Sequence, residues 1–152
     1  MSATAASAHT PAASTASFMA RRPVWQVSSL SGLAASVAVE TWGLAARAAG
    51  VPMRAAGAGG HHATPVTVGM FALGTMVVTF WFTVAVAGMA RFAGNPDRAC
   101  LRTALPLLVV SLAVPLTAAD TAISARLTLA AAHLLAGAII IPAVARRLPR
   151  VP

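Results

Sequence analysis

The sequence predicts an all-α membrane protein: a bundle of four transmembrane helices with both termini in the cytoplasm. Of its 152 residues, 58% are hydrophobic and only 9% are charged, whereas about 25% of the residues of an ordinary soluble domain are charged. The uncharged runs are long enough to cross the hydrocarbon core of a bilayer. The arginines lie between these runs and beside the outermost ones, as is typical of residues that flank membrane helices.

The net charge of +8 comes from arginine alone, because the chain has no lysine and only three acidic residues. In a soluble protein this balance would suggest nucleic-acid binding. Here the arginines flank apolar runs, so we interpret them as determinants of membrane topology and expect no nucleic-acid partner. The one cysteine, Cys100, cannot form an intrachain disulfide, and no cysteine cluster indicates a metal or haem site.

The predicted organisation has three parts: a disordered tail of residues 1–20, a membrane domain of residues 21–147 and a short C-terminal tail of residues 148–152. The first tail is rich in Ala, Ser and Thr, a composition that builds no core. Arg21 and Arg22 precede an apolar run, which leaves a signal peptide as an alternative. That run is longer than the apolar region of about 7–15 residues in a signal peptide, so a retained helix is favoured.

The first helix is predicted over residues 24–46, with Trp25 and Trp42 near its two ends, where indole rings prefer the membrane–water interface. Small residues on one helix face let a second helix approach closely. A carboxylate at membrane depth costs about 2.5–3.5 kcal/mol at a helix centre. We therefore expect one face of this helix to point inward, since it carries small residues and a carboxylate at strict four-residue spacing. These residues are Ser28, Gly32, Ser36 and Glu40.

The second helix is predicted over residues 66–90 and is apolar almost throughout. Thr75, Thr79 and Thr83 lie four residues apart on one of its faces. Threonine hydroxyls bond to the carbonyl one turn earlier or to a neighbouring helix. We therefore interpret this face as a packing surface rather than a polar pathway.

The third helix is predicted over residues 103–119. Residues 91–102 before it are expected to form a short basic loop, because Asn95-Pro96 is a turn signal. Pro106 suits the first turn of the helix, and Pro115 should kink or end it.

The fourth helix is predicted over residues 121–145, with Asp120 or Thr121 as its N-cap. Four crossings place the termini on one side, and the loop arginines give the orientation. Eight arginines fall on the side of the termini and three on the other, which predicts cytoplasmic termini in a cell membrane. The eight are Arg21, Arg22, Arg91, Arg98, Arg102, Arg146, Arg147 and Arg150; the three are Arg47, Arg54 and Arg126.

Two ionisable residues fall within the predicted helices at depth: Glu40 and His133. Glu40 precedes Arg47 by seven residues, and His133 follows Arg126 by seven. At about 1.5 Å per residue, each group lies about 10 Å below the outer edge of the membrane, so the two are level. Gly137, one turn beyond His133, permits close helix approach there.

Three interpretations of this intramembrane polar pair remain open. The two groups form a satisfied contact that fixes which helices are neighbours, or they form a proton-responsive or substrate-contacting site. Alternatively they do not meet, and Glu40 reaches Arg47, Arg54 or Arg126 at the interface.

No pattern in the sequence indicates an enzyme, since we find no Ser/His/Asp arrangement and no phosphate-binding glycine loop. The adjacent His61 and His62 lack a carboxylate or cysteine partner, so they predict no metal site. We expect no cofactor. The expected function is that of a small non-enzymatic integral membrane protein that acts through helix packing in the lipid bilayer, as a homo-oligomer or as an accessory subunit of a larger membrane complex.

The alternative function is that of a small carrier or proton-linked transport component that uses Glu40 and His133. In that case further polar residues near the outer edge would support the pair. They are Asp120, Arg126 and Arg47.

Several short segments of the chain match the pattern of a known family. They are Ala46-Arg47-Ala48-Ala49-Gly50-Val51, Ser111-Leu112, Pro115-Leu116, His133-Leu134, Ile141-Pro142 and Ala145-Arg146-Arg147. On these segments the chain resembles a family of small four-helix integral membrane proteins of actinobacteria, a domain of unknown function. The resemblance covers residues 28–147 and implies four helices and a cell-membrane location. It implies no activity and no catalytic residues.

Overall fold

The computed structural model describes residues 22–57 and 59–148, and this part of the chain is an all-α fold of four long helices. The predicted tail of residues 1–20 lies outside the described residues. Two very short strands form an antiparallel hairpin between the first two helices. The elements are α2 (Val24–Ala48), β1 (Arg54–Ala55), β2 (Thr64–Pro65), α3 (Met70–Phe92), α4 (Pro96–Leu116) and α5 (Ile123–Ala145).

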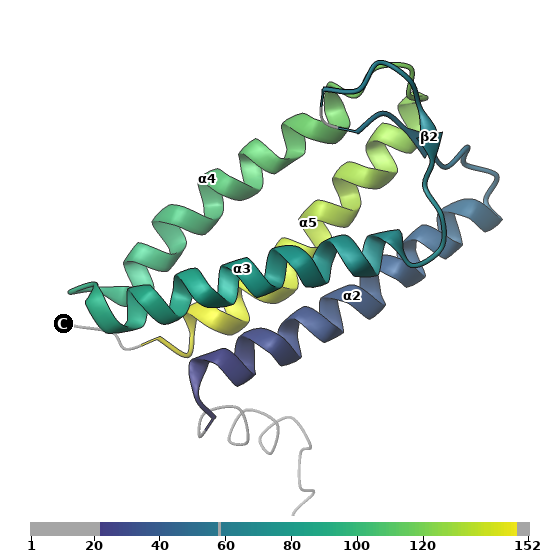
Figure 1. Cartoon of the computed structure of the whole chain (residues 1–152). Coiled ribbons are helices and arrows are strands. Elements are labelled where there is room, and N and C mark those ends of the chain that lie inside the picture. Colours follow the sequence, from purple (N-terminus) through teal and green to yellow (C-terminus); the bar gives the residue numbers. More distant parts are fainter. Residues whose placement is uncertain (1–21, 58, 149–152) are drawn as a thin grey trace, which may run out of the picture.

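Helices α2 and α5 form the centre of the bundle. Helix α2 packs along α3 and along α5, and α5 packs along α4. Helices α3 and α4 meet at the end where residues 93–95 join them, and they diverge toward the other end (Figure 1). The α2–α3 and α4–α5 pairs are therefore joined mainly through the α2–α5 contact.

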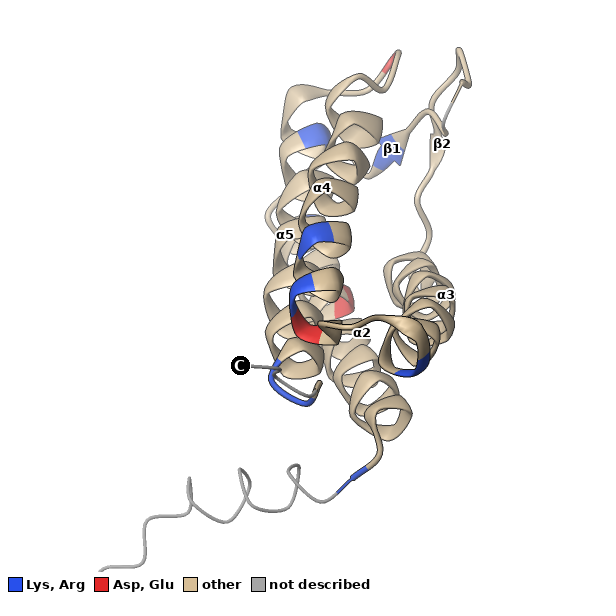
Figure 2. Ribbon diagram, turned by 90° about the vertical axis from the view of Figure 1, so that its left-hand side faces the viewer, with Lys and Arg blue, Asp and Glu red and all other residues tan. Residues whose placement is uncertain are grey.

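Three of the four helices, α3, α4 and α5, are long and apolar enough to cross a membrane, which suggests a membrane protein. Helix α2 is not among them although it has 25 residues, because it carries serines, Gln26 and Glu40. Many large apolar side chains are exposed on the outside of the bundle, and the helices carry few charged positions along most of their length (Figure 2). An exposed apolar surface of this extent suits contact with lipid.

The buried core lies along the central helices in two clusters. The first is near the termini and draws on all four helices; the second is near the hairpin and joins α2, α3 and α5. Alanine or valine accounts for three of the six residues in the first cluster and two of the three in the second, and such short side chains let the helix backbones come close together. The first comprises Ala35, Val86, Cys100, Ile140, Val144 and Leu148, and the second Val39, Phe71 and Ala132.

The third predicted helix starts too late: α4 begins at Pro96, not at residue 103. Asn95-Pro96 is a turn signal, but proline is also favoured at the first helical position, and Asp97 adds a favourable negative charge to the first turn of the helix. Most of the predicted basic loop is therefore helical. Pro106 consequently lies inside the helix, while Pro115 falls in its last turn as predicted.

The other helix bounds differ less from the prediction. Helix α3 begins at Met70, four residues after the predicted start, because Gly69 adopts a left-handed conformation (φ 90°) that only glycine enters readily. Asp120 does not cap α5; the N-cap position is Ala122, and it has no side-chain bond. Asp120 itself has a positive φ of 47° in the preceding turn.

Candidate functional site

The two residue stripes singled out in the sequence face each other across the α2–α3 interface. Ser28, Gly32 and Ser36 of α2 are all buried. Ser28 Oγ lies 2.7 Å from Thr83 Oγ1 of α3. Since the Thr83 hydroxyl donates its only proton to the carbonyl of Thr79, Ser28 is the donor in this bond. These three residues of α2 therefore lie on the side of the helix that faces α3.

The helices come closest at Gly32. A Cβ placed on Gly32 would lie 2.3 Å from Cγ2 of Thr79 and 2.9 Å from its Cβ. Thr79 is itself buried, with 4% of its surface exposed. Only glycine therefore fits at position 32 at this helix separation.

The threonine face of α3 is satisfied within its own helix. Thr75, Thr79 and Thr83 donate to the carbonyls one turn earlier, at distances of 2.7–2.8 Å. Each hydroxyl has a single proton, so these three hydroxyls have no proton left to donate to an anion or a substrate. This supports the interpretation of the face as a packing surface.

Glu40 binds the N-terminus of α3 at the hairpin end of this interface. Its Oε1 accepts the backbone N–H of Gly69 at 2.8 Å, and its Oε2 accepts that of Ala72 at 3.1 Å. The first N–H groups of a helix have no partner within the helix and carry partial positive charge. Gly69, the N-cap residue, has no side chain that could satisfy them. Glu40 thus supplies from α2 the cap that α3 lacks.

Arg47 lies two turns beyond Glu40 and extends the same contact. Its Nη1 lies 4.0 Å from Glu40 Oε1, and its Nη2 donates to the carbonyl of Val66 at 2.7 Å. The guanidinium also lies 5.9 Å from the centre of the Phe71 ring. That ring packs against Gly43, where a Cβ would lie 3.0 Å from it. Arg47 and Glu40 together hold the segment before α3 against α2.

His133 makes its hydrogen bond within its own helix, α5. Its Nδ1 lies 2.8 Å from the carbonyl of Leu129 one turn earlier, so that nitrogen carries the proton and donates. Gly137, on the same face one turn later, packs against Leu108 of α4, 2.7 Å from the position of an added Cβ. Within the described chain no hydrogen bond or ion pair joins His133 to Glu40, and Glu40 is paired with Arg47 instead.

The supporting polar residues predicted near the outer edge tie two loops together. Asp120 Oδ2 accepts the N–H of Ala63 at 3.2 Å, and Thr121 Oγ1 accepts that of Ala56 at 3.1 Å. Arg126 donates to the carbonyls of Thr121 and Leu116, at 3.0 and 3.3 Å. The β1–β2 hairpin is thereby fixed to the α4–α5 connection. Among residues 22–57 and 59–148, no hydrogen bond or ion pair joins Asp120, Thr121 or Arg126 to Glu40 or His133, so Arg47 is the one predicted supporting residue that pairs with Glu40.

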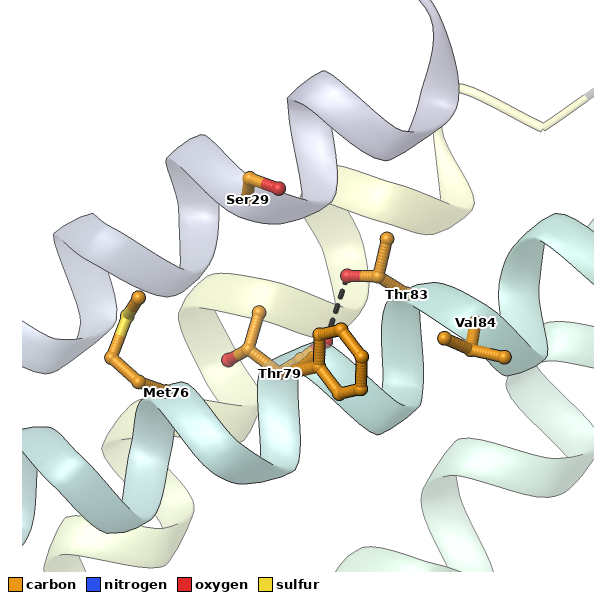
Figure 3. A pocket seen from close by; sticks show the side chains of 6 residues that line it. Ser29, Met76, Thr79, Thr83 and Val84 are labelled. Atoms are coloured by element: carbon orange, nitrogen blue, oxygen red, sulfur yellow. Dashed lines mark hydrogen bonds between the residues drawn. The ribbon is translucent and has the colours of Figure 1, made fainter.

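The α2–α3 groove widens into one small hollow of about 280 Å³, lined by Ser29, Met76, Thr79, Phe80, Thr83 and Val84 (Figure 3). Its lining is mostly apolar and it is open to the outside. Ser29 donates to the carbonyl of Trp25 at 2.9 Å, so its hydroxyl proton is also engaged. The hydroxyls of Thr79 and Thr83 in the same lining also donate within their own helix.

His61 and His62 are exposed in the turn between β1 and β2. In residues 22–57 and 59–148, no three His, Cys, Asp or Glu side chains form a group that could hold a metal ion.

Sequence reasoning missed the partners of Glu40, the backbone N–H groups of Gly69 and Ala72. The sequence did contain a signal for this contact. Helix α3 is preceded by Gly69, which has no polar side chain to cap the helix, so a group from elsewhere in the chain was needed.

One protein-family model, described as a family of unknown function (DUF6069), matches residues 19–150. The comparisons with curated proteins and with solved structures gave no match.

Proposed function

This chain belongs to the family of unknown function DUF6069, and we propose that it is a non-enzymatic integral membrane protein that acts through its helix surfaces. It crosses the cell membrane four times, with both termini in the cytoplasm, and it works as a homo-oligomer or as an accessory subunit of a membrane complex.

The main observation behind this proposal is that the side chain of Glu40 is fully engaged in bonds between α2 and the start of α3. Both of its carboxylate oxygens accept backbone N–H groups, and Arg47 lies beside it. A carboxylate used in this way stabilises the α2–α3 pair and lowers the cost of placing α2 in a membrane. Of the four described helices, α2 is the one whose composition alone is not apolar enough for a membrane span. The bonds of Glu40 make this helix compatible with a fourth crossing.

The charge distribution supports the proposed orientation. The described end that holds the termini carries Arg22, Arg91, Arg98, Arg102, Arg146 and Arg147, and the hairpin end carries Arg47, Arg54 and Arg126. An excess of arginine in short loops marks the cytoplasmic side.

The orientation is testable by cysteine labelling of whole cells. In a Cys100→Ser background, His61→Cys should react with a membrane-impermeant maleimide added outside. Arg146→Cys should react only after permeabilisation, and labelling of Arg146→Cys from outside would refute the orientation.

The mode of action is tested by purification from native membranes in a mild detergent, followed by native mass spectrometry. A homo-oligomer or a stoichiometric partner protein is expected. Because the inward faces of α2 and α3 are occupied by each other, the contact surface must be an outward one, such as the Phe80 and Trp81 region of α3, whose rings pack edge to face at 5.4 Å. A monomer that conducts protons in liposomes, with conduction lost in both Glu40→Gln and His133→Ala, would overturn the proposal in favour of a carrier.

A further inference from the structure

The arginines at the two ends of the bundle differ in the hydrogen bonds that their side chains make. At the hairpin end, Arg47, Arg54 and Arg126 each donate to at least one backbone carbonyl. At the end of the termini, Arg147 donates to the carbonyl of Arg22. The guanidiniums of Arg98, Arg102 and Arg146 are exposed, and no hydrogen bond or ion pair within the described chain engages them. We call these three residues the basic cluster.

The basic cluster lies where α4 changes from polar to apolar. Arg98 and Arg102 are one turn apart on the exposed face of α4, and Leu101 and Leu105 are exposed beside them. Beyond Arg102, α4 carries no charged residue up to its end at Leu116. Guanidiniums at this level reach the headgroup region while the leucines reach the acyl chains.

The opposite face of the same turns is fixed to the bundle. Cys100 is fully buried and packs with Val144 and Leu148, near the end of α5. This packing brings the first turns of α4 beside residue 146. The one acidic residue in these turns is Asp97, so the cluster retains net positive charge.

We propose that the basic cluster of Arg98, Arg102 and Arg146 binds the phosphate groups of anionic phospholipids in the cytoplasmic leaflet. This inference rests on the proposed membrane insertion. A planar guanidinium with all its donors free matches two phosphate oxygens at once. Arginines bound to carbonyls, as at the hairpin end, have fewer donors left for a lipid.

The expected size of the effect follows from electrostatics. Each arginine near an anionic membrane surface favours binding by about fivefold, so removal of two should weaken it by up to about 30-fold. The preference should also fall as salt is added, because exposed charges are screened.

The experiment uses the full chain in mild detergent, mixed with equal amounts of phosphatidylglycerol and phosphatidylcholine, with bound lipid counted by native mass spectrometry. Wild type should retain phosphatidylglycerol preferentially, and Arg98→Gln/Arg102→Gln should lose most of this preference. Arg54→Gln, an exposed arginine at the other end, is the matched control and should keep it. Circular dichroism melting should show that both variants remain folded.

Three outcomes would overturn the inference: equal retention of the two lipids by wild type, an unchanged preference in the double variant, or an equal loss in Arg54→Gln. Displacement of lipid by inorganic phosphate at the same concentration would also contradict it, because the site would then bind free phosphate. Flotation with pure phosphatidylcholine vesicles and alkaline extraction separates the two proposals. A chain that fails to insert there refutes the membrane function, whereas one that inserts without lipid preference refutes the lipid site alone.

Discussion

Replacement of Gly32 by alanine tests the central claim about α2–α3 packing. The added methyl would lie 2.3 Å from Cγ2 of Thr79, about 1.1 Å short of the 3.4 Å at which ordinary contact begins. Thr79 has little room to yield, since it is buried, its side chain is branched at Cβ, and its hydroxyl is bonded to the carbonyl of Thr75. The helices themselves must therefore separate.

The free-energy cost of separating the two helices can be estimated from its contributions. Overpacking of this kind costs about 1–3 kcal/mol. A shift of about 1 Å would also stretch the 2.7 Å bond between Ser28 and Thr83 beyond bonding distance, at a further loss of about 0.5–1.5 kcal/mol. Alanine regains up to about 1 kcal/mol of helix propensity. With that gain counted in full, the net expectation is a destabilisation of about 0.5–3.5 kcal/mol. At about 2–4 °C per kcal/mol for a chain of this length, this corresponds to a fall in melting temperature of about 1–14 °C.

The assay is thermal unfolding in detergent, with Gly74→Ala as the matched control. That substitution adds the same methyl to α3 at a position with no neighbouring atom within 4 Å, so its melting temperature should stay the same or rise slightly. The double variant Gly32→Ala/Thr79→Ala should recover part of the loss, because the closest remaining atom is then the Thr79 Cβ position at 2.9 Å. Equal melting temperatures for Gly32→Ala and Gly74→Ala would refute the reasoning.

Three further substitutions test other contacts. Glu40→Ala leaves two helix N–H groups without their acceptor and should lower stability by about 1–2 kcal/mol; hydrogen exchange at the start of α3 should accelerate, and unchanged exchange would contradict the capping role. Gly137→Ala should cost less than about 1 kcal/mol, since the atoms in its way are the terminal methyls of Leu108, which can rotate aside; a melting loss as large as that of Gly32→Ala would show that this contact is more rigid than we infer. Asp120→Ala removes the acceptor of the Ala63 N–H, so exchange of that amide should rise by about fivefold or more while global melting changes little, and an unprotected Ala63 amide in wild type would count against the docked hairpin.

The sequence predicted which residues of α2 share a face, and which residues of α3 do, because that signal is local. Four-residue spacing of small residues determines a helix face regardless of what packs on it. Ser28, Gly32 and Ser36 therefore had to share a side, and so did the three threonines. That the two stripes face each other depends on tertiary packing, and the spacing within each stripe carries no information about its partner.

The relation between Glu40 and His133 could not be derived in the same way. Counting residues from Arg47 and from Arg126 gives a height along each helix but not the direction in which a side chain points. Glu40 points toward α3, whereas the face of His133 lies toward α4 at Gly137. Equal depth is thus a necessary condition for contact and not a sufficient one. The predicted first residue of α4 was wrong for another reason. The dipeptide Asn95-Pro96 is common both in turns and at the start of helices, so its composition alone does not distinguish the two.

The short connection at residues 93–95 has a consequence for how the bundle assembles. It joins α3 to α4, which share little packing away from that connection, whereas each helix packs well against its other neighbour in the chain. The α2–α3 and α4–α5 pairs are thus local units of low contact order, expected to form early and separately. The α2–α5 contact and the docked hairpin join distant parts of the chain and complete the assembly. A chain divided within residues 93–95 keeps both helical hairpins, and its two halves should reassociate through α2, α5 and the hydrogen bonds at Asp120 and Thr121.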